Sequence, residues 1–297
     1  MKIVEAYQTF YVKYHKILLY IPIIATVLAL FVIGMHYQQT GDIMNKDVSL
    51  KGGITATVYT QQPINFQDLE QQLRTVFSDV DVKKLAEFGN DQAIGAIIEA
   101  DTQDEKLLTQ TLEQALKIKL TEDIYSIEVV GSSLGSSFYK QMLTAILFAF
   151  LFMGIVVFFI YKSIIPSLAV IGAAFADIVI TLAIIDIIGM KMSTAAISAL
   201  LLLIGYSVDS DILQTTKMLK RTGETVEKRM FDSMKTTLTM SIAAIATLLV
   251  GYLISTSLII KEMFLIMLIG LIVDAFYTYW TNSGILLNYV EKHQHHG

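Results

Sequence analysis

Six long apolar runs dominate the hydropathy pattern of this chain, and polar or charged residues separate them. Each run is close to or above the roughly 20 residues that an α-helix needs to cross a bilayer. The runs cover residues 17–35, 142–161, 164–188, 192–213, 238–254 and 263–289. This pattern predicts a polytopic membrane protein in which six transmembrane helices form an all-α bundle.

The first apolar run has features of a signal peptide, because Lys13 and Lys16 precede it. It is longer than the apolar region of a usual signal peptide, and no small-residue cleavage site follows Gly34. We therefore interpret it as an uncleaved membrane anchor.

The segment between the first two runs alternates in a way typical of a small α+β domain. Strands are expected at 48–60, 80–88, 92–100 and 125–130, and amphipathic helices at 65–77 and 103–120, with Asn65 as a helix N-cap. The resulting order β-α-β-β-α-β is that of a ferredoxin-like domain. We therefore predict a single small domain inserted between the first and second spans.

Basic residues near the predicted helix ends set the orientation, since cytoplasmic loops carry an excess of Lys and Arg. One side would hold Lys2, Lys13, Lys16, Lys162, Lys217, Lys220, Arg221, Lys228, Arg229 and Lys235. The opposite short links hold little more than Lys191 and Lys261. Both termini are therefore expected in the cytoplasm. The predicted parts are a cytoplasmic N-terminus with the first span (1–37), an extracytoplasmic domain (38–138), spans two to six (139–290) and a cytoplasmic tail (291–297).

Composition supports the membrane assignment and excludes some other classes. Hydrophobic residues make up 54% of the chain and charged ones only 16%, against about 25% in soluble domains. The absence of cysteine excludes disulfides and thiolate metal sites. Residues 40–138 carry 16 Asp and Glu against 8 Lys and Arg, which argues against a nucleic-acid-binding surface there.

Four acidic residues lie inside predicted spans or near their ends: Asp177, Asp209, Asp211 and Asp274. An acid near the centre of a transmembrane helix costs roughly 2.5–3.5 kcal/mol, so such residues usually face a bundle interior and serve ion or proton pathways. We expect these four to form a proton or ion relay. The alternative is that single members are helix-end residues or structural partners of hydroxyl groups, as we assume for Asp186.

Helical periodicity places small or hydroxyl-bearing residues beside three of these acids, so that neighbouring helices can approach them closely. Asp209 and Asp211 are about 200° apart on a helix, so they cannot face the same partner. We expect Asp209 to be the principal carrier and Asp211 to lie nearer the cytoplasmic water. Lys235 is a possible counter-charge or a cytoplasmic anchor. The stripes are Ala173, Ala174 and Thr181 with Asp177; Gly205 and Ser198 with Asp209; and Gly270, Tyr277, Thr278 and Thr281 with Asp274.

Motifs of enzymes and cofactor sites are missing from the sequence. It contains no Walker A motif, no HExxH and no GxSxG, and the histidines of the terminal EKHQHHG belong to a solvated tail. An intramembrane aspartyl protease would need its acids in Tyr-Asp and Gly-x-Gly-Asp contexts, neither of which is present. We therefore expect no catalytic residues, cofactor or metal.

The segment GYSVDSD at 205–211 resembles the fourth-span signature of the SecF branch of the SecD/SecF family, in its archaeal form. Further similarities are KGG at 51–53, VGSSLG at 130–135, AD at 176–177 and TNSG at 281–284. Gly205, Tyr206 and Ser207 would be helix-packing residues of this motif. Three features depart from bacterial members. The Asp of the bacterial fourth-span motif aligns with Ser210. Thr239 stands where bacterial members have an Arg in the fifth span, and Asp274 stands where they tend to have Gly.

The resemblance implies a six-span subunit of the resistance-nodulation-division superfamily that pairs with a six-span SecD. Such pairs work beside the SecYE translocon and use the proton motive force to draw unfolded secretory polypeptides across the cell membrane. Two alternatives remain open. The chain could stabilise SecD or the translocon without its own ion coupling, or it could be a transporter subunit for small molecules or lipids.

Overall fold

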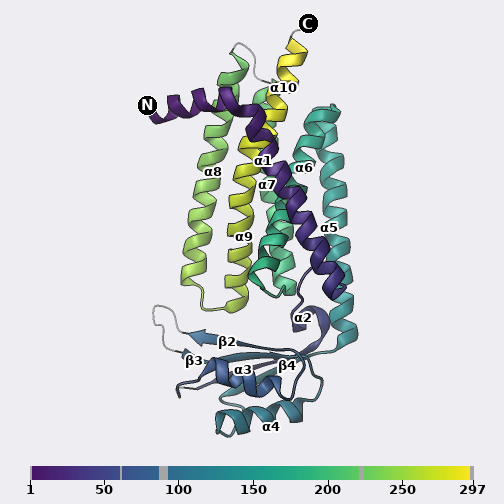
Figure 1. Ribbon diagram of the computed structural model, residues 1–297, viewed down its shortest axis with the longest axis vertical. Helices are drawn as coiled ribbons and strands as arrows, with labels where there is room; N and C mark the ends of the chain where they lie inside the picture. The colour runs from purple at the N-terminus through teal and green to yellow at the C-terminus, as the bar shows by residue number, and fades with distance from the viewer. Residues whose placement is uncertain (1, 61, 87–92, 221–223, 295–297) are drawn as a thin grey trace.

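The molecule consists of a helical bundle with a small sheet domain at one end, and both termini lie at the other end (Figure 1). The computed structural model describes residues 2–60, 62–86, 93–220 and 224–294. The bundle contains α1 Lys2–Thr40, α5 Ser132–Tyr161, α6 Ile164–Ile188, α7 Thr194–Lys220, α8 Val226–Ile254, α9 Leu258–Tyr277, the π-helix η1 Thr278–Asn282 and α10 Ser283–Gln294.

Within the described residues, five helices are long and apolar enough to cross a membrane. They correspond to the first five predicted runs and cover Thr9–Thr40, Ser132–Tyr161, Ile164–Ile188, Thr194–Leu219 and Val226–Ile254. The sixth run corresponds to α9, η1 and α10, a helical stretch whose first half carries Lys261, Glu262 and Asp274.

Several helices are longer than their apolar runs. The run at 192–213 begins two residues before α7, which continues to Lys220, and the run at 238–254 is the second half of α8. The polar extensions of α7 and α8 pack on the ends of α1 and α10 in a cluster at the end of the bundle that holds the termini. Its buried members include Tyr11, Met218, Met230, Met234 and Leu286. Hydropathy detects only the apolar part of a helix, so it misses extensions that tertiary packing stabilises.

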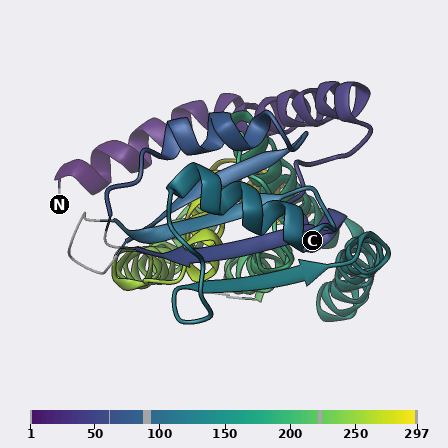
Figure 2. The same cartoon turned by 90° about the horizontal axis from the view of Figure 1, so that it is seen from below.

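The sheet domain contains four antiparallel strands in the order β2-β3-β1-β4. The strands are β1 Gly53–Tyr59, β2 Val80–Ala86, β3 Ala93–Ala100 and β4 Tyr125–Val130, and two helices, α3 Phe66–Arg74 and α4 Glu105–Leu116, cross one face. Figures 1 and 2 show that these helices cover the face turned away from the bundle. The opposite face of the sheet therefore lies toward the bundle.

The domain has its own core between the sheet and its two helices. Ile54, Ala56 and Val58 alternate along β1 and are fully buried, and they pack with Leu73 of α3 and Leu112 of α4. Each helix begins at the cap that its sequence supplies. The Asn65 side chain accepts the backbone N–H of Asp68 at 3.3 Å, as predicted, and Asp104 accepts that of Leu107 at 3.0 Å.

The predicted strand at 48–60 is wrong in its first part. Val48–Lys51 forms a single helical turn, α2, capped by Asp47, and the strand begins only at Gly53. Gly52 has φ +90°, and a Cβ there would collide with the backbone of Ser132 at the start of α5. A close backbone approach therefore lies just before the strand. It joins the outer domain to α5.

Candidate functional site

Three helices at the centre of the bundle enclose a polar cluster. Asp177 on α6, Asp211 on α7 and Asp274 on α9 are each no more than 1% exposed. The three helices pack against one another pairwise, so the acids lie at their common seam. Sequence periodicity predicted this location for Asp177 and Asp274, and the structure confirms it.

The carboxyl group of Asp177 is held by α7 and faces α9. The hydroxyl of Ser207 donates to Asp177 Oδ2 at 2.6 Å. The carboxyl groups of Asp177 and Asp274 are neighbours in the cluster. Two neighbouring carboxyl groups out of water cannot both carry a charge at low cost.

Thr278 links the other two acids. Its hydroxyl lies 2.9 Å from Asp211 Oδ1 and 3.3 Å from Asp274 Oδ1. Asn282 Nδ2 donates to Asp211 Oδ1 at 2.7 Å, and the Ser210 hydroxyl lies 3.5 Å from Asp274 Oδ2. Among the described residues, hydroxyl and amide groups of other side chains thus donate the hydrogen bonds to Asp211 and Asp274.

The π-helix η1 supplies two of these donors. Its wider turn carries Thr278 and Asn282, which are buried together with Thr281. Gln214 of α7 donates to the Ser283 hydroxyl, which in turn donates to the backbone carbonyl of Thr278 at 3.0 Å. A π-helical turn within an α-helix often marks a functional site. Here it turns amide and hydroxyl groups toward the acids.

Two carboxyl oxygens of the cluster, Asp177 Oδ1 and Asp211 Oδ2, are buried without a hydrogen-bond partner among the described residues. Because burying an unpaired charge is costly, these oxygens fit carboxyl groups that hold a proton. The hydroxyl and amide partners keep the three carboxyl groups in place.

The expected positions of Asp209 and Asp211 relative to the bundle interior are wrong. Asp209 is exposed on α7, whereas Asp211 is fully buried in the cluster. The 200° separation did place the two acids on different sides of the helix. Which side faced the bundle depended on the packing of α6 and α9, which the sequence does not state.

Other predicted residues fall outside the cluster or at its edge. Lys235 is exposed on α8, so it is not a counter-charge for the buried acids. Gly205 is exposed, and the Tyr206 hydroxyl donates to the backbone carbonyl of Met240 on α8 at 2.9 Å. Ser207 is part of the cluster through Asp177. Asp186, which we set aside, pairs with His36 Nδ1 at 2.8 Å on α1.

Sequence reasoning missed four polar members: Ser210, Gln214, Asn282 and Ser283. A signal was present on α7, where Ser207, Asp211 and Gln214 follow one another at spacings of four and three residues, which is one face of a helix. The π-helical turn at 278–282 gives no comparable signal. It alters the helical phase on which such spacing arguments depend.

The fold and site define a class: a membrane-embedded helical bundle with a titratable cluster at its centre and a compact sheet domain on one end. The family model for the protein-export membrane protein SecD/SecF C-terminal region matches residues 110–292. The chain belongs to this family.

Relatives of similar length support the assignment. The chain is 35% identical to the protein-export membrane protein SecF of Methanothermobacter thermautotrophicus, with 94% of each chain covered. It is 33% identical to the SecF of Pyrococcus furiosus, with 94% of this chain and 92% of that one covered. The crystal structure of SecDF from Thermus thermophilus, described as a translocon-associated membrane protein, matches with a TM-score of 0.72 at 17% identity. That match covers 94% of this chain but 38% of the longer SecDF chain, and it shows a shared fold.

Proposed function

We propose that this chain is an accessory subunit of the Sec protein-export machinery that pairs with SecD and uses the proton motive force to promote export of unfolded polypeptides. The role in export rests on the family and on the relatives named as protein-export membrane proteins. The observation that supports ion coupling is the trio of buried acids, Asp177, Asp211 and Asp274, joined across three helices.

Coupling requires a change in helix packing when a proton binds. The ionised cluster carries buried charge, whereas the protonated cluster carries hydroxyl donors in the same place. Each state therefore favours different contacts among α6, α7 and α9. Because α9 begins at the end of the bundle next to the sheet domain (Figure 1), such a change would reach the outer domain directly.

The exposed face of α7 is suited to contact with a helix of a partner protein. Leu202 is 55% exposed, and Gly205 and Asp209 follow it on the same side at spacings of three and four residues. An acid facing lipid near the middle of a helix costs roughly 2.5–3.5 kcal/mol. A partner helix that offers Asp209 a donor removes this cost, and SecD is the partner that we propose for this face.

We assign the remaining architecture on the same basis. The stretch from α9 to α10 is the sixth span, covering 263–289. The inserted segment 38–138 is a ferredoxin-like extracytoplasmic domain, as its strand order supports. The end of the bundle that holds both termini and most of the basic residues faces the cytoplasm. The remaining parts are the N-terminus with the first span (1–37), spans two to six (139–290) and the cytoplasmic tail (291–297). SecYE and the surrounding lipid are further proposed partners.

The test is an export assay in membrane vesicles that contain the chain and SecD, with proton flux followed in parallel. Asp177→Asn and Asp274→Asn should each lower export toward the level of vesicles without the chain. The reason is that an amide keeps the volume but cannot exchange a proton. Asp101→Asn, an exposed site in the outer domain, is the matched control and should behave as wild type.

Undiminished export and proton flux in the variant with Asp177, Asp211 and Asp274 all changed to Asn would contradict ion coupling. That result would favour the alternative in which the chain only stabilises SecD. A measured loss of SecD from the membrane in the same variant would identify a structural effect of the substitutions.

A further inference from the structure

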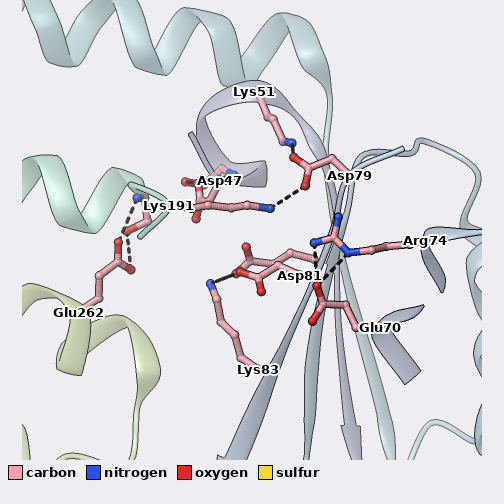
Figure 3. A network of polar contacts seen from close by, with 12 residues as sticks. Asp47, Lys51, Glu70, Arg74, Asp79, Asp81, Lys83, Lys191 and Glu262 are labelled. Carbon is pink, nitrogen blue, oxygen red and sulfur yellow. Dashed lines mark hydrogen bonds and ion pairs between the residues drawn. The ribbon is translucent and has the colours of Figure 1, made fainter. Parts of the chain in front are cut away.

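A second polar site lies outside the acid cluster, where the open face of the sheet meets the end of the bundle. A hollow of about 540 Å³ separates them. Thr55, Thr57 and Lys83 line it from the sheet, and Ser193 and Glu262 line it from the bundle. Figure 3 shows that charged side chains from both parts point into this junction.

Glu262 connects α9 to the start of α7. Its Oε1 accepts the backbone N–H of Ser193 at 3.2 Å, and its Oε2 accepts the Ser193 hydroxyl at 3.0 Å. The Ser193 hydroxyl accepts the backbone N–H of Ala196 at 3.0 Å and so caps α7. Glu262 therefore acts on the N-terminus of the helix that carries Asp211.

The connection to the outer domain reaches the same helix end. The Asp47 carboxylate accepts the Ser49 hydroxyl at 2.6 Å, and the Ser49 oxygen accepts the backbone N–H of Thr194 at 3.0 Å. The backbone N–H of Asp47 also donates to the carbonyl of Met192 at 3.1 Å. The start of α7 is thus held by α9 and by the segment that leads into the sheet.

Charged groups of the sheet complete the site. Lys83 on β2 pairs with Glu99 on β3 at 2.6 Å and also lies 3.7 Å from Asp81. Its positive charge acts on Glu262 across the hollow. Lys191, in the link before α7, is paired with Asp79 at 2.8 Å, so it is not a direct partner of Glu262.

We propose that Glu262 is a proton-binding site at the outer junction, whose protonated form stabilises the docked arrangement of the sheet domain on the bundle and whose ionised form weakens it. This inference rests on the proposed function, because it gives the proton a second place of action, at the contact between the outer domain and the helices that hold the acid cluster.

The titration of Glu262 supports this. Burial and, to a smaller extent, the charge of Asp47 raise the pKa of Glu262 to about 7, although the hydrogen bonds from Ser193 and the charge of Lys83 act in the opposite direction. An exposed glutamate titrates near 4.5. The docked state therefore binds the proton more tightly than an open state in which Glu262 meets water. Docking is favoured at low pH and becomes weaker as the pH rises from about 4.5 through about 7.

Spin labels can measure docking directly in the full-length chain in lipid nanodiscs. The chain has no cysteine, so Lys106→Cys on α4 and Ile254→Cys at the end of α8 provide two exposed, unique labelling sites. We expect the short-distance population to fall at least about tenfold, relative to the long-distance one, between pH 5 and pH 8. Glu262→Gln, a neutral analogue of the protonated form, should remain docked throughout.

Two further variants test the assignment to Glu262. Glu128→Gln, which changes an exposed acid lining the same hollow, should titrate as wild type. Ser193→Ala removes a hydroxyl that stabilises the ionised carboxylate, so the midpoint should move to higher pH. A wild-type distance distribution that does not change with pH would overturn the proposal, as would a Glu262→Gln variant that titrates like wild type. The measurement needs neither SecD nor export, so it is independent of the result for the buried acids.

Discussion

Thr278 shows how one side chain can organise the buried cluster. Its hydroxyl lies within reach of two carboxyl groups on two different helices. A hydroxyl has a single proton to donate, so at any moment it serves one acid and leaves the other to its remaining partners. Its orientation is therefore tied to which acid holds the proton.

Thr278→Val keeps the shape of the side chain and removes the hydroxyl. We expect a loss of about 1–3 kcal/mol in the free energy of unfolding, because buried carboxyl oxygens lose a donor, together with reduced export. Thr239→Val on the exposed side of α8 is the control and should change stability by less than about 0.5 kcal/mol. Thermal unfolding of both purified variants checks the difference, and equal stability would contradict the role given to Thr278.

At the scale of elements, α7 and α9 lie in close contact because a glycine faces a leucine. A Cβ on Gly270 would overlap the side chain of Leu203. The same stretch of α9 continues to Asp274 one turn later, so this contact sets the distance between the acids on the two helices. Small residues serve this purpose in many membrane bundles.

Gly270→Ala should push α9 away from α7 and lower stability by about 1–3 kcal/mol. Gly172→Ala on α6 is the matched control, because a Cβ there meets nothing within 4 Å. Since alanine favours a helix over glycine, Gly172→Ala should instead raise stability by about 0.5–1 kcal/mol. Opposite shifts in the unfolding midpoint are expected, and two shifts of the same sign would count against this packing.

At the scale of the whole molecule, Asp79 fastens the sheet domain to the bundle. It precedes β2 and pairs with Lys191 of the α6–α7 link and with Lys51 of α2 (Figure 3). Partial burial acts to raise its pKa, but the hydrogen bonds and charges of the two lysines prevail and lower the pKa of Asp79 to about 2. Its contribution to docking is present above the unfolded pKa of 3.8 and is lost as the pH falls through about 2.

Asp79→Asn should therefore weaken docking equally at pH 5 and pH 8, in contrast to the pH-dependent effect expected at Glu262. Faster backbone hydrogen exchange in β2 is the expected sign of the change. Asp101→Asn, at the end of β3, should leave this exchange as in wild type. A pH-dependent effect of Asp79→Asn between pH 5 and pH 8 would contradict the assignment.

Hydropathy and periodicity alone were enough to predict five helices that are long and apolar enough to cross a membrane, the small α+β domain and the buried positions of Asp177 and Asp274. These features depend on properties that repeat along a single element, such as apolar length, alternation and the spacing of small residues. The N-cap at Asn65 was predictable for the same reason, since a cap acts on residues three positions away.

Only the tertiary structure decided that Asp211, rather than Asp209, joins the cluster, and that Lys235 lies outside it. It also decided that Val48–Lys51 is a helical turn and that Glu262 reaches Ser193 across the junction. The physical reason is that each of these features depends on which face of an element meets a neighbour far away in the sequence. A helix with acids on two faces fits either orientation locally, and only the packing of α6, α7 and α9 together selects one.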